Sequence, residues 1–248
     1  MQKIVAIVGS NHSSSDSKFI LEKVSKTINM NEQQWDIKIV ALCEYRILEC
    51  RGCKQCFIDG ECCLNDKDDM GILIQEIKTA DIVIWTTPVY LANTSSTLKK
   101  VFDRLAHYTH VMRFAGIKSY VLITTDSSGG TYVSEYLVRV LAQFGFKVLQ
   151  SYICIAREYQ KIADQICNSI VKIKKLDYGF SNVRLEEIFR QNREYYSSIT
   201  EFADDEKYFE IVFWNQGWVR QCSSFQEFAQ HMINFRKHSK KMETYRIF

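Results

Sequence analysis

Residues 3–17 read KIVAIVGSNHSSSDS, an apolar run that ends in a glycine and a serine-rich loop. The run lacks the polar alternation of a half-exposed strand, so it predicts a strand that is buried on both faces. Helical spacing follows at 19–30, where Ile20, Val24 and Ile28 share one face. A buried strand that passes through a loop into a helix is the opening unit of an α/β fold.

The same unit recurs along the first two-thirds of the chain. Further strands are expected at 36–42, 81–85, 119–124 and 147–155. Apolar residues at helical spacing predict helices that begin at Asp69 and Ser96 and helices over 133–144 and 158–176. Right-handed crossovers leave few topologies for parallel strands. We therefore expect a flavodoxin-like α/β fold, a doubly wound sheet of five parallel strands in the order 2-1-3-4-5, with its ligand at the carboxyl ends of the strands.

The alternating strand and helix pattern ends after residue 176. Residues 177–248 combine helical spacing with many aromatic side chains, and Ser224 and Glu227 form a capping-box pattern. The stretch YFEIVFWNQGW at 208–218 fits a helix or a strand. We expect a flavodoxin-like domain at 1–176, with a cysteine loop at 43–69, and a helical, aromatic-rich extension at 177–248.

Composition excludes several classes of protein. The chain has 248 residues and a net charge of +3, and it shows no long basic stripe, so we expect no nucleic-acid partner. The basic run at 236–241 is interpreted as a solvated helix end, where cations suit the helix dipole. Neither a signal peptide nor a membrane-length apolar run is seen, so we expect a cytoplasmic protein with no membrane partner. Its nine cysteines are then expected to be thiols, metal ligands or redox groups.

The loop after the first strand, residues 9–17, has features of a phosphate site. Five serines supply hydroxyl donors, His12 could supply a cation, and the loop leads into a helix N-terminus, where backbone N–H groups favour an anion. The loop matches neither the dinucleotide-binding nor the nucleoside-triphosphate fingerprint. The alternative is a flexible polar loop with a helix cap.

Two further loops are expected at the same edge of the sheet. Residues 86–93 hold the only proline, Pro88, which could stiffen backbone against a flat ring beside Tyr90. Residues 124–130 end in Gly129 and Gly130, which let backbone approach a ligand closely. Each loop alone is also explained as an ordinary turn. Together they predict one crevice with a phosphate end and a ring end, as a mononucleotide cofactor requires.

The segment that follows the second strand is rich in sulfur. Cys50, Cys53, Cys56 and Cys62 are spaced C-x2-C-x2-C-x5-C, and Cys63 duplicates the last of them. Thiolates at this spacing suit an iron–sulfur cluster, whereas structural zinc more often uses two separated pairs. A reversible disulfide or free thiols remain open alternatives. The other four cysteines lie in apolar runs and are expected to be buried, namely Cys43, Cys154, Cys167 and Cys222.

Over residues 3–155 the chain resembles the NAD(P)H-dependent FMN reductases of flavodoxin-like fold, and its cysteines resemble those of the iron–sulfur flavoprotein branch. The motifs that carry the resemblance are the 10–17 serines, the cysteine segment running into Asp68-Asp69-Met70, Pro88-Val89-Tyr90, and Leu98-Lys99 followed by Asp103-Arg104. Two departures from the family pattern are His12, where arginine is usual, and Ser17, where threonine is usual. Histidine in place of arginine at position 12 implies phosphate binding that is weaker and depends on pH.

The resemblance implies FMN as the cofactor and NAD(P)H as the electron donor. It implies that Ser10, His12, Ser15 and Ser17 hold the FMN phosphate. It places Pro88, Val89, Tyr90 and Asn93 on one side of the flavin ring and Thr125, Asp126, Gly129 and Gly130 on the other. In the iron–sulfur branch, Cys50, Cys53, Cys56 and Cys62 would bind a [4Fe-4S] cluster. Homodimers or homotetramers are expected.

These expectations lead to one main function and two alternatives. The main one is an FMN-dependent NAD(P)H oxidoreductase that passes electrons to a small acceptor, such as a quinone, an aromatic compound or an activated double bond. Hydride arrival needs no acid or base, so we assign no catalytic residue. The alternatives are an iron–sulfur electron carrier that exchanges electrons with ferredoxin, and a cysteine-based redox or metal sensor on the same scaffold.

Overall fold

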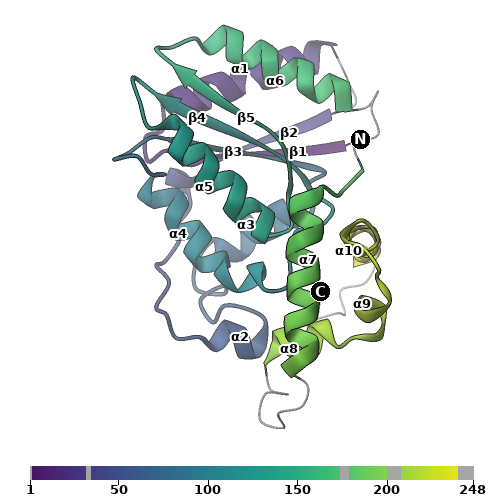
Figure 1. The fold of residues 1–248 in the computed structure, drawn as a ribbon. Helices are drawn as coiled ribbons and strands as arrows, with labels where there is room; N and C mark the ends of the chain where they lie inside the picture. The colour runs from purple at the N-terminus through teal and green to yellow at the C-terminus, as the bar shows by residue number, and fades with distance from the viewer. Residues whose placement is uncertain (1, 32–34, 174–178, 200–207, 240–248) are drawn as a thin grey trace.

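A computed structural model describes residues 2–31, 35–173, 179–199 and 208–239 (Figure 1). Five parallel strands form one sheet in the order β2-β1-β3-β4-β5, which confirms the predicted topology. The strands are β1 (Gln2–Val8), β2 (Trp35–Ala41), β3 (Ile82–Pro88), β4 (Lys118–Thr125) and β5 (Lys147–Ile155). In the described parts of the chain, no helix is long and apolar enough to cross a membrane.

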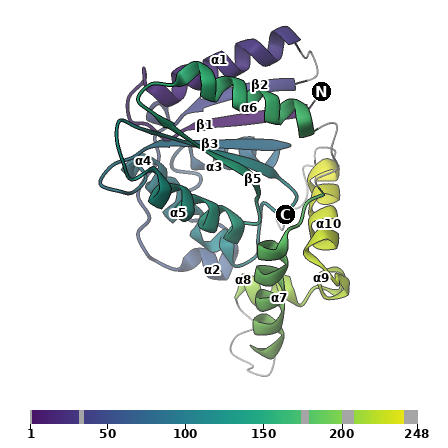
Figure 2. The same cartoon turned by 45° about the horizontal axis from the view of Figure 1, so that its top comes forward.

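Helices cover both faces of the sheet, as the unbroken apolar strands require. On one face lie α1 (Asp16–Asn31) and α6 (Tyr159–Ile173), and on the other lie α3 (Met70–Lys78), α4 (Ser96–Leu105) and α5 (Gly130–Gln143) (Figures 1 and 2). Ile4, Ala6 and Val8 of β1 enter the core beneath α1 and α6, whereas Val5 and Ile7 enter the opposite core. Each strand residue is therefore buried on the side to which its alternating Cβ points.

The C-terminal extension has its own apolar core. Its helices are α7 (Val183–Ser198), α8 (Phe209–Trp214), α9 (Gly217–Gln221) and α10 (Phe225–Ser239), so the described part of the ambiguous stretch 208–218 is helical. Phe213, Trp214 and Phe228 meet at its centre, and Met112 and Ala115 of the preceding segment join them. The extension thus packs against the loop before β4, and it is not an independent bundle.

The start of α10 is capped by more than the predicted box. The Ser224 hydroxyl accepts from the backbone N–H of Glu227 at 3.2 Å, as expected. The Glu227 carboxylate instead accepts from Ser223 at 2.8 Å, and the first N–H of α10, on Phe225, donates to Glu186 of α7 at 2.7 Å. A long-range carboxylate therefore fastens α10 to α7, which local spacing does not reveal.

The extension also covers part of the cysteine segment, which we define as residues 43–69. This segment begins within the 3-10 turn Leu42–Glu44 and contains the short helix α2 (Gln55–Asp59). A second 3-10 turn, Ala106–Thr109, follows α4. α8 lies beside α2 (Figures 1 and 2). A Cβ added to Gly60 would lie 2.7 Å from the Phe209 ring, so the ring rests directly on that glycine.

Replacing Gly60 with alanine should therefore weaken the fold more than replacing Gly52 does. Both glycines have positive φ, 77° and 64°, so each Gly→Ala change carries a left-handed penalty of about 1–2 kcal/mol. Only Gly60→Ala adds a clash with Phe209, which overpacking data put at about 1–3 kcal/mol. Urea unfolding of the two variants measures the difference, and equal losses would contradict the contact.

Candidate functional site

Three loops meet at the carboxyl edge of the sheet, where β1, β3 and β4 end. Beyond the last residue of β1, the Gly9 N–H donates to the Thr86 carbonyl of β3 at 2.9 Å. A Cβ on Gly9 would lie 2.4 Å from that oxygen, so glycine is required by close approach. This is the point at which the strand order reverses, the usual ligand position in open α/β sheets.

The loop at 9–17 presents unused donors to solvent. In the described chain, the backbone N–H groups of Asn11, Ser13 and Ser15 have no hydrogen-bond acceptor. Ser10 is almost fully buried and its hydroxyl oxygen accepts from the His12 N–H at 3.1 Å, which leaves its own proton free to donate. A cluster of such donors before a helix N-terminus suits an anion.

The other predicted phosphate residues take different positions. Ser15 accepts from the Lys18 N–H at 3.3 Å and so caps α1. Ser17 is fully buried, with its hydroxyl 3.3 Å from that of Thr124. His12 is exposed and accepts from the Ser14 N–H at 3.3 Å. Thus His12 and Ser10 lie in the loop that an anion would approach, whereas Ser17 fastens the loop to β4.

Residues that the sequence did not single out connect the loops. Ser95 caps α4 by accepting from the Leu98 N–H at 3.1 Å, and its hydroxyl donates to the Gly9 carbonyl. Thr97 donates to the Asn11 side chain at 3.2 Å. The start of α4 therefore holds the phosphate-side loop in place. The position of Ser95 before an apolar helix is a capping signal that the sequence shows. Its hydrogen bond to the Gly9 carbonyl could not be predicted from the sequence.

The loop after β3 makes a tight, strained turn. Tyr90 and Asn93 exchange backbone hydrogen bonds at 2.9 and 3.0 Å. Between them, Leu91 and Ala92 have φ values of 49° and 57°, a left-handed pair that normally takes glycine or asparagine. Leu91 is 101% exposed, and Tyr90 is also exposed. Strain of this kind clusters at ligand sites.

The loop after β4 packs against the same turn. Val89 donates its N–H to the Thr124 carbonyl at 3.0 Å, and a Cβ on Gly129 would lie 2.9 Å from the Val89 side chain. Thr125 donates to the Ser128 carbonyl at 2.9 Å and so closes the loop, with Asp126 exposed on it. Gly130 begins α5. The predicted ring-side residues are therefore brought together at one edge.

A buried ion pair fixes the cysteine segment. Arg104 of α4 binds the Asp68 carboxylate, and both side chains are fully buried. Arg104 also donates to the Leu48 carbonyl at 3.0 Å and to the Asn65 side chain at 3.1 Å. Asp68 in turn accepts from the Leu48 N–H at 2.8 Å and the Met70 N–H at 3.0 Å. One guanidinium thus joins the two ends of the segment that carries the cysteines.

The cysteines are neighbours, but they do not form the site of a single metal ion. The sulfur atoms of Cys53 and Cys63 lie 3.9 Å apart, and Cys63 is the chain neighbour of the predicted ligand Cys62. Burial and the nearby Cys62, Cys50 and Cys53 raise the pKa of Cys56 to about 11. Among the residues that the structure describes, no three His, Cys, Asp or Glu side chains are grouped closely enough for one ion. Cys154, Cys167 and Cys222 are buried as predicted, whereas Cys43 is only half-buried.

Comparison with known proteins agrees with this arrangement. The family model described as NADPH-dependent FMN reductase matches residues 2–160. An iron–sulfur flavoprotein of Archaeoglobus fulgidus is 28% identical over 144 residues, which cover 58% of this chain and 64% of that protein. The chain thus spans less than two thirds of the length of this relative, and only 48% of a second from the same organism.

Solved structures share the fold at low sequence identity. RosB, determined with bound 8-demethyl-8-formylriboflavin-5'-phosphate, gives a TM-score of 0.58 at 15% identity, covering 79% of this chain and 88% of that one. An NAD(P)H:quinone oxidoreductase from Methanothermobacter marburgensis gives 0.54 at 16% identity, covering 71% and 98%. At these identities the likeness supports the fold alone.

Changing Asp68 to asparagine should strongly destabilise the protein. The change leaves Arg104 charged and buried without its partner, which costs about 3–5 kcal/mol. The free energy of unfolding in urea at pH 7 measures this loss. Asp103→Asn is the matched control, because Asp103 pairs with Lys99 at the surface of the same helix and such a pair contributes about 0–1 kcal/mol.

The free energy of unfolding of Asp68→Asn should also fall less at acid pH than that of the wild type. Burial alone would raise the pKa of Asp68, but hydrogen bonds from Arg104, Leu48 and Met70 outweigh it and hold the pKa below its ordinary value. The stabilisation is therefore complete above the unfolded pKa, about 3.9, and disappears as pH falls through the lower folded pKa. If Asp68→Asn had the same free energy of unfolding as the wild type at pH 7, that result would contradict the stabilising role of the ion pair.

Proposed function

Because the chain belongs to the family of NADPH-dependent FMN reductases, we propose that its carboxyl-edge crevice binds FMN and that NAD(P)H reduces it there. The family makes the chain an FMN-dependent oxidoreductase. The observation that carries the assignment of the site is the convergence of three loops, joined by Ser95, Ser17 and Gly129, at the strand-order reversal.

The residues present fit FMN. The free N–H groups of Asn11, Ser13 and Ser15 and the hydroxyl of Ser10 would hold its phosphate, with His12 at the rim. Gly129 has no side chain, so the backbone of the 125–130 loop can approach a flat ring closely. Pro88 restricts the backbone of the 88–93 loop, which can lie against the same ring. When bound, FMN accepts a hydride from the nicotinamide and passes electrons on. Val89 and Tyr90 would orient the ring and exclude water from one side of it.

We propose a small, flat electron acceptor for the second half of the reaction. Tyr90, Leu91 and Tyr132 are exposed apolar or aromatic side chains on the two loops that border the crevice and the start of α5. Exposed aromatic side chains around a cofactor suit a quinone or another aromatic compound. The quinone oxidoreductase of M. marburgensis, which shares the fold, is named for such an acceptor.

Flavin titration of the purified chain tests the site. The wild type should bind FMN and oxidise NADH or NADPH with a quinone. His12→Arg should tighten FMN binding several-fold, because a guanidinium binds phosphate through two parallel hydrogen bonds. His12→Ala should weaken it, and Lys26→Ala, at an exposed residue of α1, serves as control. A colourless protein that does not bind added FMN would favour the sensor alternative.

We also propose that the cysteine segment holds a [4Fe-4S] cluster on Cys50, Cys53, Cys56 and Cys62. Two observations support it: the four thiols share one neighbourhood, and Cys62 lies close enough to Arg104 to favour the charged guanidinium. A cation beside thiolates stabilises their negative charge. The iron–sulfur flavoprotein relatives favour the same reading. With a cluster present, electron exchange with ferredoxin is the alternative function. From the family resemblance we also propose a homodimer or homotetramer.

Anaerobic purification with iron, sulfide and flavin analysis tests the cluster. We expect about four irons and four sulfides per chain, as a cubane requires. Cys56→Ser should abolish iron binding while FMN binding remains, and Cys167→Ser, which changes a buried packing thiol, should leave iron content unchanged. Flavin without iron in the wild type would leave a plain FMN oxidoreductase with a thiol or disulfide loop.

A further inference from the structure

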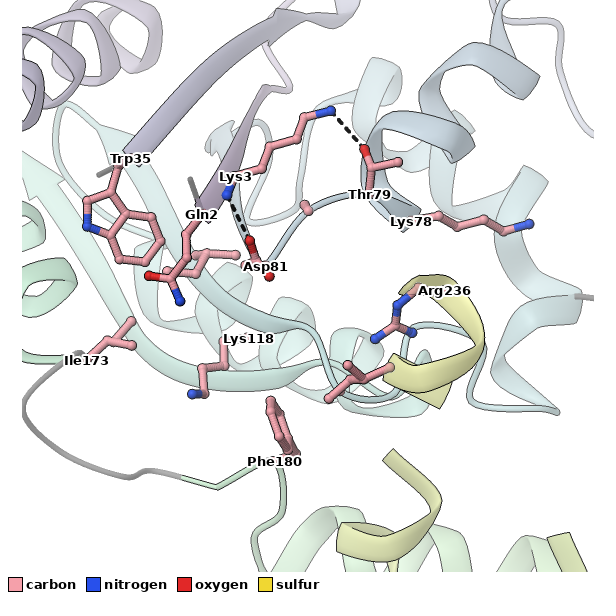
Figure 3. Close-up of a pocket in the computed structure, with 14 residues that line it drawn as sticks. Gln2, Lys3, Trp35, Lys78, Thr79, Asp81, Lys118, Ile173, Phe180 and Arg236 are labelled. Atoms are coloured by element: carbon pink, nitrogen blue, oxygen red, sulfur yellow. Dashed lines mark hydrogen bonds between the residues drawn. The ribbon is translucent and has the colours of Figure 1, made fainter. Parts of the chain in front are cut away.

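Outside the proposed FMN site, a cavity of about 390 Å³ lies at the amino-terminal edge of the sheet (Figure 3). The Lys3 ammonium at its border is paired with Glu76 at 2.7 Å, and the Asp81 carboxylate accepts from the Lys3 backbone N–H at 2.8 Å. Asp81 also attracts the guanidinium of Arg236. Opposite charges thus face one another in this cavity, which gives no reason to expect a charged ligand. The chemistry that the proposed function leaves unassigned lies instead in the cysteine segment.

Cys63 is the thiol that the C-x2-C-x2-C-x5-C spacing does not use. Its sulfur atom lies 3.9 Å from that of Cys53, a distance at which one thiol can donate to the other. Both residues are exposed, so small reagents can reach the pair. A contact between two accessible thiols is the starting geometry for a disulfide.

The backbone around Cys53 can supply the remaining movement. A disulfide bond is about 2.05 Å long, so the two sulfur atoms must approach one another by about 2 Å. Cys53 lies between Gly52 and Lys54, whose φ values are 64° and 61°, and a Cβ added to Gly52 would meet nothing within 4 Å. Because this turn is unpacked on its outer side, rotation about the two Cα–Cβ bonds and a small shift of the turn can close the gap.

The helix α2, which separates the two cysteines in the sequence, does not have to move. Its C-cap residue, Gly60, is packed under α8, and its Phe57 ring lies 5.0 Å from the His110 ring. Cys53 precedes α2 and Cys63 follows it, so both thiols lie on turns outside these contacts. A disulfide would thus close a loop around a helix that is already fixed, which limits the entropy that loop closure costs.

The other cysteines are less suited to the same reaction. Cys56 and Cys62 are only half-exposed, and the three buried cysteines lie in the apolar cores. Cys50 is exposed, but its sulfur atom accepts from the Gly52 N–H at 3.5 Å. Cys53 and Cys63 therefore combine exposure with contact between their sulfur atoms.

We propose that Cys53 and Cys63 are oxidised to an intramolecular disulfide by a low-molecular-weight disulfide. One protein thiolate attacks the small disulfide, forms a mixed disulfide and releases one small thiol. The second protein thiolate then attacks the mixed disulfide and releases the other small thiol. The two protein thiols lose two electrons and two protons, and the small disulfide gains them as two thiols. An added dithiol such as dithiothreitol reverses the reaction.

The Cys53–Cys63 disulfide and the proposed [4Fe-4S] cluster exclude one another. Cys53 is one of the four proposed ligands, and a sulfur atom in a disulfide is not a thiolate that can bind iron. Cys63 thus competes with the cluster for Cys53: oxidation withdraws this ligand and reduction returns it. The exclusion rests on the proposed cluster, whereas the disulfide itself does not.

Thiol counting on the full, FMN-loaded and iron-free chain tests the pair, with one equivalent of oxidised glutathione as the probe. The wild type should lose two of its nine thiols and yield a cross-linked peptide that joins Cys53 to Cys63. Cys63→Ser should instead keep one glutathione on Cys53, because no second thiol displaces it. Cys62→Ser, which changes the adjacent cysteine, is the matched control and should form the same cross-link as the wild type.

Iron uptake by the two redox forms tests the exclusion. The reduced chain should take up iron and sulfide anaerobically, and the cross-linked chain should take up at least about tenfold less until dithiothreitol is added. The iron-loaded chain should in turn be protected from the cross-link.

The outcomes separate the disulfide from the cluster. No cross-link, or a cross-link at another pair of cysteines, would overturn the disulfide, and equal iron uptake by both forms would overturn the exclusion. A chain that takes up no iron even when reduced would contradict the proposed cluster, while the glutathione reaction still decides whether Cys53 and Cys63 pair.

Discussion

The buried pair of Arg104 and Asp68 is the constraint on which the cysteine segment depends. A charge that is removed from water needs a partner and hydrogen bonds, and the terminal nitrogens of Arg104 obtain both only if residues 48, 65 and 68 come together. The segment has almost no regular structure of its own, apart from five helical residues in α2. Its shape is therefore imposed from outside, by a side chain of α4.

The helix α4 links the proposed FMN loops to the cysteine segment. At its first turn Ser95 holds the loop of Gly9, and at its last turn Arg104 holds the cysteine segment. The ten residues between these ends span about 15 Å. Its apolar face, with Leu98, Val101 and Leu105, is completely buried against the sheet. A rigid helix between the flavin loops and the cysteines keeps their separation constant, which electron transfer between them would require.

Local sequence patterns predicted the strands and helices, but they did not predict the contacts between residues that are distant in the chain. The five strands and their order followed from apolar runs and crossover rules, and the three loops followed from that order. Residues 208–218 stayed ambiguous because aromatic side chains suit both states, and only packing in the third core decides for helix. The roles of Arg104 and Ser95 and the proximity of Cys63 to Cys53 depend on contacts between distant parts of the chain, which no periodicity reports.

The contact between Phe209 and Gly60 has a consequence for biosynthesis. A nascent chain emerges from its amino end, so the flavodoxin-like sheet can form while the last quarter of the chain is still being made. In the cysteine segment, α2 then stays uncovered until α8 is synthesised and its Phe209 ring packs on Gly60. Arrival of the extension then fixes α2 against the Phe209 ring, but Cys50, Cys53 and Cys63 stay exposed in the folded chain. Access to these thiols is therefore retained after the extension has packed.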